Sequence, residues 1–317
     1  MRIGLDAMGG DYAPRAAVEG AVDTLSRVEE DVRIVLIGDE VQIREELARL
    51  NTDPGLFDIV HASQVITMAD HPAKAFSMKR NSSIAVGFGM LKNELIHGFA
   101  SAGNTGAMLV GASYTVNVIP GIFRPALSAM VPKVGGGSSV ILDVGINPDC
   151  KPDVLLQYGI LGSMFAKHVL GVENPTVALV NIGEEERKGS SAVRSAYELM
   201  KDNSDINFVG NIEGNLLFSD KMPDVLVCDG FVGNVIIKQA EAFYNVCREK
   251  SINDPFFERF DFENIGGTPV IGVNANVVIG HGISQRKAIM NMIIQTVDVV
   301  KADLANRIKL TLSNGKD

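Results

Sequence analysis

The turn SAGNTGA joins a short apolar run to a longer apolar stretch, and it contains two glycines, an asparagine and a threonine. Asn104 or Thr105 can cap a helix that begins here, while Gly103 and Gly106 let the backbone come close to a ligand. Free N–H groups and the positive dipole end at a helix start bind phosphate well. The turn is therefore either a capped tight turn or an anion pocket. It matches neither GxxxxGK[ST] nor GxGxxG, which excludes the standard nucleotide loops.

Three further polar turns carry side chains that can hold or transfer charge. In LDAMGGDYAP, Asp6 follows an apolar run and can orient a base or a substrate, unless the segment is only a turn whose Asp11 caps the next helix. In GHGIS, the glycines beside His281 favour an exposed imidazole, which suits acid–base chemistry or phosphate binding. In NIGEEERKGS, Lys188 can face a phosphate, although the three glutamates also suit a plain helix start.

A basic segment, HPAKAFSMKRNSSI, contrasts with the acidic balance of the chain. Its cations Lys74, Lys79 and Arg80 form either a solvated loop or a rim for an anionic partner. The 317 residues together have a formal net charge of -9. Because nucleic-acid backbones are bound by clustered Lys and Arg, this balance argues against a nucleic-acid partner.

The remaining reactive residues exclude several classes of chemistry. The three cysteines are widely spaced without a CxxC motif, which is typical of a reducing compartment and excludes a disulfide framework or a cysteine-rich zinc site. Acids and histidines match no metal signature, and no GxSxG nucleophile elbow appears, so no metal site is expected. No signal peptide is visible and the apolar stretches are too short to span a membrane, which predicts a cytosolic protein.

The elements that must position these turns alternate along the chain. Short apolar runs, such as RIGLDAM, VRIVLIG, GFASAG, SVILDVG and TVALVNIG, are typical of strands covered on both faces. Amphipathic segments separate many of them, and a final helix is expected over 284–309. The alternation predicts an α/β fold with helices on both sides of a mostly parallel sheet. In such sheets, ligands bind beyond the carboxyl ends of the strands, where the polar turns lie.

No linker or repeat divides the sequence, so a single α/β domain is predicted over residues 1–317. A compositional shift, with four phenylalanines in SINDPFFERFDFE, predicts a projecting helical arm at about 240–264. Phe256, Phe257 and Phe260 fall on one helical face, which suits a dimer contact, an acyl-chain groove or a membrane anchor. Because the arm lacks a polybasic face, a dimer or acyl contact is favoured over a membrane anchor.

The polar turns occur together and in a recognisable order. LDAMGGDYAP, HPAKA, SAGNTGA, RPAL, LDVGINPDCKP, NIGEEERKG, CDGFVGNV and the HG at 281–282 follow one another along the chain. This ordered set resembles the bacterial acyl-[acyl-carrier-protein]:phosphate acyltransferases of phospholipid synthesis, from Arg2 to about Thr296. One departure is HGIS, where the family usually has HGSS.

The resemblance implies an activity, a fold and partners. The activity is transfer of a long-chain acyl group from acyl carrier protein to inorganic phosphate, without a cofactor. The acyl phosphate then feeds a membrane glycerol-3-phosphate acyltransferase. The implied fold is a three-layer α/β/α sandwich related to phosphotransacetylases and isocitrate-type dehydrogenases. The implied state is a cytoplasmic homodimer that associates peripherally with the inner face of the membrane.

For that reaction, the candidate residues take specific roles. His281 and Lys188 are expected to stabilise charge or transfer a proton, and Asp6 to orient a partner. The expected phosphate binders are Gly103, Asn104, Thr105 and Gly106. The acidic carrier protein is expected to dock on Lys74, Lys79 and Arg80.

Two rival functions are weighed against this one. The first is an NAD-dependent dehydrogenase on the related fold, which predicts an absorbance change with the cofactor. The second is a non-enzymatic scaffold that binds acyl carrier protein or phosphate without turnover. Release of free thiol that depends on phosphate distinguishes the transferase from both.

Overall fold

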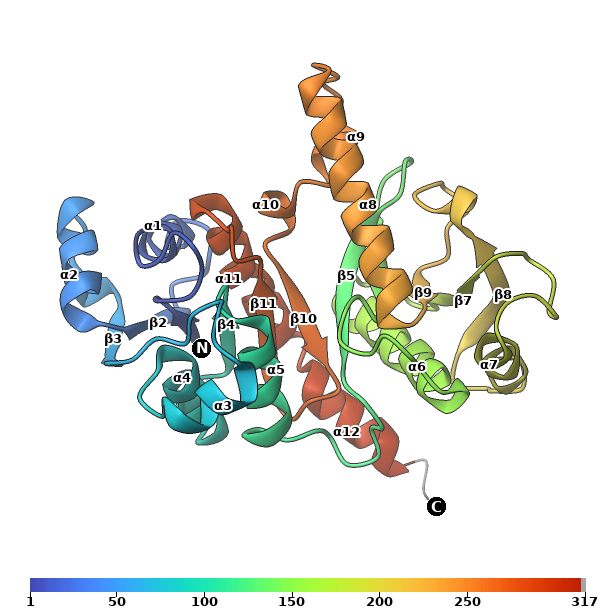
Figure 1. Cartoon of the computed structure of the whole chain (residues 1–317), viewed down its shortest axis with the longest axis horizontal. Helices are drawn as coiled ribbons and strands as arrows, with labels where there is room; N and C mark the ends of the chain where they lie inside the picture. The colour runs from blue at the N-terminus through green and yellow to red at the C-terminus, as the bar shows by residue number, and fades with distance from the viewer. Residues whose placement is uncertain (315–317) are drawn as a thin grey trace. The chain divides into compact units, whose positions relative to one another are not determined.

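The computed structural model describes residues 1–314, and the chain forms two compact units. Unit 1 consists of Met1–Val118 and Phe262–Asp303. Unit 2 consists of Ile119–Asp261 and the C-terminal segment that begins at Leu304. Figure 1 follows the chain by colour from the N-terminus onward. That the two units act as the single domain expected from the sequence stays a prediction.

Unit 1 is built on a sheet with the strand order β3-β2-β1-β4-β11-β10. Its neighbours pair in parallel except β10 and β11, which are antiparallel. The strands are β1 (Arg2–Asp6), β2 (Arg33–Gly38), β3 (Asp58–His61), β4 (Gly98–Ser101), β10 (Gly267–Ile271) and β11 (Asn276–Gly280). The central strands are buried on both faces, as continuous apolar runs predict.

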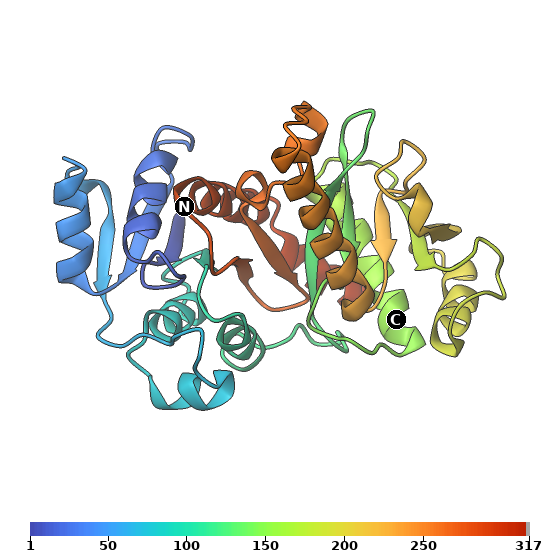
Figure 2. The ribbon, with the colours of Figure 1, turned by 45° about the horizontal axis from the view of Figure 1, so that its top comes forward.

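Helices cover both faces of this sheet (Figure 2). Ile3 and Leu5 of β1 lie in one hydrophobic core with side chains of α1 and α11. On the opposite face, Phe99 of β4 meets Phe88 of α4, with ring centroids 5.2 Å apart. The helices of unit 1 are α1 (Arg15–Thr24), α2 (Glu40–Arg49), η1 (Pro54–Leu56), α3 (Pro72–Met78), α4 (Ser83–Lys92), α5 (Thr105–Tyr114), α10 (Phe262–Ile265) and α11 (Arg286–Lys301).

The expectation of one final helix over 284–309 is wrong. The structure has two helices there, α11, which ends at Lys301, and α12 (Leu304–Asn314). Asp303 between them has a φ of 51°, which is a left-handed conformation that an α-helix does not continue through. The helical periodicity is nearly unbroken across this residue, so the sequence pattern alone did not reveal the break.

Unit 2 carries strands in the order β5-β6-β9-β7-β8. Only β5 and β6 pair antiparallel. Helix α6 packs on β6 and β9, while α8 contacts β5 and β6. The strands are β5 (Ala126–Pro132), β6 (Ser138–Leu142), β7 (Thr176–Asn181), β8 (Asn207–Glu213) and β9 (Val225–Val227). The remaining elements are α6 (Pro152–His168), α7 (Ser191–Lys201), η2 (Gly214–Leu216), α8 (Gly230–Glu249) and α9 (Pro255–Glu258).

The Phe-rich segment folds back within unit 2. The Phe260 ring is buried, and its centroid lies 5.2 Å from that of Phe256 and 5.0 Å from that of Phe218. Arg259 donates hydrogen bonds to the Lys133 carbonyl (3.0 Å) and to Ser138 (3.2 Å). The Phe257 ring centroid lies 5.6 Å from that of Phe256, so all three phenylalanines are part of one cluster. Of the helices that the structure describes, none has the length and apolar character to cross a membrane.

Close packing between α1 and α11 depends on the absence of a side chain at Gly20. A Cβ there would lie 2.6 Å from Ile289 Cβ and 2.7 Å from the Arg286 carbonyl oxygen. We expect Gly20→Ala to lower the free energy of unfolding by about 1–3 kcal/mol through overpacking. The matched control is Gly89→Ala in α4, where a Cβ has nothing within 4 Å. That variant is expected to be stabilised by up to about 1 kcal/mol; equal effects in denaturant unfolding would contradict the explanation.

Candidate functional site

The carboxyl ends of three neighbouring parallel strands bring the predicted turns together. Strand β4 pairs with both β1 and β11, so the turns that follow these strands share one edge of the sheet. Asp11 N donates to the Gly282 carbonyl at 2.7 Å. Ser101 Oγ donates to Asp6 Oδ2 at 2.6 Å. These contacts bring the LDAMGGD, SAGNTGA and HGIS turns together.

Asp6 is a buried carboxylate at the centre of this cluster, 1% exposed. Its oxygens accept hydrogen bonds from the Met8 N–H (3.0 Å) and from the Ser101 hydroxyl. Burial raises the pKa of Asp6 above its ordinary value, and the bonds from Ser101 and from Ser83 of α4 oppose that rise. The Ser101 oxygen in turn accepts from Gly103 N at 2.9 Å. Asp6 thus connects the LDAMGGD turn after β1 to the SAGNTGA turn after β4.

Asn104 begins helix α5 and ties it to another loop. Its Oδ1 accepts from Ala107 N at 2.9 Å, which is an N-cap. Its Nδ2 donates to the carbonyls of Thr67 (3.0 Å) and Asp70 (3.1 Å). Both amide hydrogens of the side chain are therefore engaged within the protein.

The other predicted phosphate binders differ in what they offer. Gly103 N already donates to Ser101, and Thr105 is exposed. Gly106 lies against Pro72, because a Cβ on it would be 2.4 Å from Pro72 Cγ. The N–H groups of Thr105 and Gly106 lie in the first turn of α5, where no intrahelical carbonyl is available to them. Together with the dipole, these main-chain groups are what the turn presents to an anion.

A cavity of about 340 Å³ opens beside this turn. Gly10, Asp11 and Gly103 line it from the strand ends. The other lining residues are Met8, Val65, Ile66, Thr67, Met68 and Ala69. The polar turn SAGNTGA, called the anion turn below because it is the proposed phosphate site, and a mainly apolar cavity therefore share Gly103.

The loop that walls this cavity is held by an ion pair. Lys79 Nζ lies 2.6 Å from Asp70 Oδ2 and 2.9 Å from the Val65 carbonyl. Asp70 also accepts from Thr67 N at 2.7 Å, and Lys79 together with that bond lowers the pKa of Asp70 to about 2. Of the three predicted docking cations, Lys79 thus has a structural contact, whereas Lys74 and Arg80 are exposed.

The two predicted acid–base residues lie in different units. His281 is half-buried in the turn after β11, and its ring centroid is 5.1 Å from that of Phe262. Lys188 is exposed in unit 2, in the turn after β7, where Asn181 Nδ2 donates to the Lys188 carbonyl at 3.1 Å. Lys188 is therefore not among the residues that unit 1 brings together.

Sequence reasoning missed a second buried carboxylate, which lies in unit 2. Asp143 is fully buried and accepts from Leu127 N (3.0 Å), Asn147 N (2.6 Å) and Asn147 Nδ2 (3.1 Å). The motif LDVGIN at the end of β6 resembles LDAMGG at the end of β1, and this similarity was the available signal. Burial, followed by the charge of Asp143, raises the pKa of Cys150 to about 11. Burial likewise raises the pKa of Cys228, so both thiols are protonated at neutral pH.

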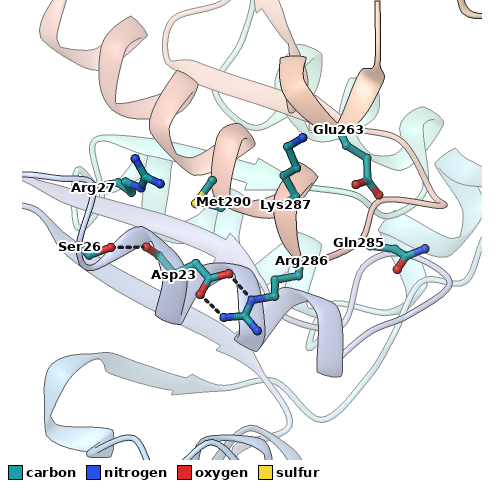
Figure 3. Close-up of a pocket in the computed structure, with 8 residues that line it drawn as sticks. All are labelled: Asp23, Ser26, Arg27, Glu263, Gln285, Arg286, Lys287 and Met290. Atoms are coloured by element: carbon teal, nitrogen blue, oxygen red, sulfur yellow. Dashed lines mark hydrogen bonds and ion pairs between the residues drawn. The ribbon is translucent and has the colours of Figure 1, made fainter. Parts of the chain in front are cut away.

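A larger cavity, of about 560 Å³, lies elsewhere in unit 1 (Figure 3). It is lined by the end of α1 and the start of α11, and an ion pair joins Asp23 to Arg286 across it. Arg27 and Lys287 also line it, and within the described chain neither has an ion-pair partner. The described residues include no cluster of three or more His, Cys, Asp or Glu that could hold a metal ion.

The fold class of the chain is that of phosphotransacetylases. EutD phosphotransacetylase from Staphylococcus aureus superposes with a TM-score of 0.63 at 15% identity, over 95% of this chain and 94% of that chain. A phosphotransacetylase from Streptococcus pyogenes gives 0.66 at 15%, over 94% of each chain. A putative 4-hydroxythreonine-4-phosphate dehydrogenase from Salmonella typhimurium gives 0.57 at 12%, over 94% and 99%. The expected mostly parallel α/β fold flanked by helices is confirmed.

Sequence comparison then identifies the family. Residues 1–307 match the model of the family described as "Fatty acid synthesis protein". The "Phosphate acyltransferase" of Syntrophomonas wolfei is 40% identical over 318 residues, covering 99% of both chains. That of Dictyoglomus turgidum is 39% identical over 327 residues, covering 97% of this chain and 96% of the relative. The chain belongs to the phosphate acyltransferase family, and it is an acyltransferase enzyme, as the ordered motifs predicted.

The hydroxyl of Ser101 is expected to stabilise the charged form of Asp6. We expect Ser101→Ala to raise the pKa of Asp6 further and to lower the free energy of unfolding by about 1–3 kcal/mol near neutral pH. Below the unfolded pKa of 3.8, Asp6 is protonated in the folded and unfolded states of both proteins. The loss should therefore grow as the pH rises from 3.8 through the folded pKa, and fade as it falls.

The measurement is denaturant unfolding of both proteins across this pH range. The control is Ser77→Ala, which removes an exposed hydroxyl that donates only to the Lys74 carbonyl. A Ser101→Ala loss that is independent of pH would show that the hydroxyl does not act on the carboxylate.

Proposed function

We propose that the chain transfers a long-chain acyl group from acyl carrier protein to inorganic phosphate, giving acyl phosphate. The observation that carries the proposal is about 40% identity to phosphate acyltransferases over nearly the whole chain. The geometry that supports it is the first turn of α5, where the N–H groups of residues 105–106 have no intrahelical carbonyl partner and lie beside an apolar cavity. No cofactor is part of the reaction.

The chemistry makes modest demands on the protein. Phosphate is largely a dianion near neutral pH and needs little deprotonation, while the leaving thiol has a pKa of about 8.5. The difficult tasks are holding two partners together and stabilising the oxyanion of the tetrahedral intermediate. The phosphate oxygen attacks the thioester carbonyl, the C–S bond breaks, and the thiolate leaves on the carrier. Main-chain N–H groups of Thr105 and Gly106 hold the phosphate in this proposal.

His281 and Lys188 are proposed to stabilise charge or move the proton to the thiol. Covalent catalysis by a cysteine is disfavoured, because Cys150 and Cys228 are buried thiols with raised pKa values. Asp6 acts by positioning, since its oxygens bond to the turns that surround the phosphate. The only support for a dehydrogenase function is a shared fold at 12% sequence identity, so the acyltransferase is favoured.

The partners and location follow from the same proposal. We propose a cytoplasmic homodimer that associates peripherally with the inner face of the membrane, where a glycerol-3-phosphate acyltransferase consumes the product. Large apolar side chains recur along one stripe of α8, and their exposure supports an interface on that helix. They are Phe231 (64%), Val235 (47%), Phe243 (63%) and Val246 (49%).

The activity itself is tested with purified protein, an acyl carrier thioester and phosphate. Release of free thiol that requires phosphate is expected, together with acyl phosphate trapped by hydroxylamine. Binding of the carrier without thiol release would favour the scaffold instead. An absorbance change with NAD and no thiol release would favour the dehydrogenase.

The role of Asn104 is separated by two substitutions. Asn104→Ala loses the cap and both tethers, so a loss of about 1 kcal/mol in unfolding free energy and a higher KM for phosphate are expected. Asn104→Asp keeps the cap, but it places a negative charge at the anion turn and should raise that KM about tenfold or more. The control is Asp39→Ala, which removes the N-cap of α2 and should leave the KM unchanged. Unchanged KM and kcat in both Asn104 variants would show that phosphate does not bind at this turn.

Docking of the acidic carrier is tested at the exposed cations Lys74 and Arg80. Their joint reversal, Lys74→Glu with Arg80→Glu, should lower kcat/KM for the carrier thioester about three- to tenfold and flatten its salt dependence. A small soluble thioester should be used equally well by both proteins. The matched control reverses Arg27 and Lys287, which line the other cavity of unit 1. An effect seen only when Arg27 and Lys287 are reversed would show that the carrier docks near the end of α1 and not at Lys74 and Arg80.

A further inference from the structure

The cavity beside the anion turn is lined mainly by hydrocarbon side chains. Met8, Val65, Ile66, Met68 and Ala69 supply the apolar lining, and Asp11 is its one ionisable group. The Met68 side chain is 50% exposed, although a large apolar side chain is normally stabilised by burial. A ligand with an apolar segment would remove this surface from water.

The wall of the cavity is a built structure rather than a loose loop. Thr67 and Asp70 carbonyls both accept from Asn104 Nδ2, at 3.0 and 3.1 Å. Asp70 also accepts from the Thr67 hydroxyl at 3.0 Å, and Lys79 bridges Asp70 to the Val65 carbonyl. The segment 65–70 is thus fixed at both ends, so its apolar side chains are held in place without a ligand. Such preorganisation lowers the cost of binding.

The position of the cavity relates it directly to the reacting groups. Gly103 lines it and precedes the first turn of α5, where the phosphate is proposed to bind. Met68 also lies next to the HGIS turn after β11, because a Cβ on Gly282 would be 3.0 Å from Met68 Cε. A chain seated here would therefore have its carboxyl end close to the phosphate.

We propose that this cavity binds the hydrocarbon chain of the acyl donor next to its thioester, and that Met8 and Met68 determine which chains fit. The inference rests on the proposed function, because that reaction supplies the acyl group. At about 340 Å³ the cavity is at the small end of ligand pockets, so it takes one segment of a chain. The flexible, polarizable methionines adapt to chains of different length, while Asp11 disfavours a free fatty carboxylate over a neutral thioester.

The expected magnitude follows from burial of methylene groups. Each CH₂ that enters the cavity contributes about 0.8 kcal/mol, which is about a fourfold gain in kcat/KM per added carbon until the cavity is full. Removal of side-chain volume by Met68→Ala should move that limit to longer chains. A charge introduced by Met68→Glu should weaken use of long chains about tenfold or more.

The experiment measures kcat/KM for saturated acyl-pantetheine thioesters of increasing chain length. The matched control is Met78→Glu, because Met78 is 69% exposed on α3 and does not line the cavity. Denaturant unfolding of each variant verifies that it is folded. A shift of the length limit in Met68→Ala, with loss of long chains in Met68→Glu alone, is the expected result. Identical length profiles in wild type, Met68→Ala and Met68→Glu would overturn the proposal.

Direct binding separates this proposal from the proposed function. Titration calorimetry with a nonhydrolysable acyl-pantetheine thioether is expected to show about tenfold weaker binding to Met68→Glu than to Met78→Glu. If thiol release never depends on phosphate while this difference holds, the acyltransferase reaction fails and the acyl site remains. If phosphate-dependent release is present and the two variants bind the thioether equally, the cavity is not the acyl site.

Discussion

The hydrogen bond from the Ser101 hydroxyl to the buried carboxylate of Asp6 joins the two turns on which the site depends. A carboxylate taken out of water is costly, and its burial is offset only where several donors converge on it. Here the donors come from the turn after β1, from Ser101 at the end of β4 and from Ser83 of α4. The buried carboxyl group of Asp6 therefore holds the turn after β1, the end of β4 and the start of α4 together.

The reaction proposed for the site makes few demands on reactive side chains. Both buried thiols have raised pKa values, and the described residues gather no metal-binding cluster. Acyl transfer from a thioester to phosphate requires neither, because both the nucleophile and the leaving group are already good. What it requires is an anion held near a carbonyl in a site from which water is displaced. In the proposal, the start of α5 supplies main-chain donors for the anion, the cavity supplies an apolar surface, and His281 and Lys188 supply charge.

Much of the fold followed from local sequence pattern, and part of the site did too. Continuous apolar runs predicted β1, β2, β4, β6 and β7, and the polar turns after strands singled out Asp6, Asn104 and His281 as candidate site residues. The pattern failed where contacts are long-range. Nothing near Asn104 in the sequence shows that its amide bonds to residues 67 and 70, or that Lys79 is used to hold Asp70. The break at Asp303 was missed because one residue in a left-handed conformation leaves the helical period almost intact.

The double use of Asn104 limits how this enzyme can vary. The same side-chain amide caps helix α5 and fastens the loop that walls the cavity. Grafting of a longer or differently shaped 65–70 loop would therefore disturb the anion turn unless two carbonyls were returned to the same places. Diversification among homologues is then easier through exchange of single lining side chains than through insertion or deletion in this loop, and engineers who wish to alter selectivity face the same restriction.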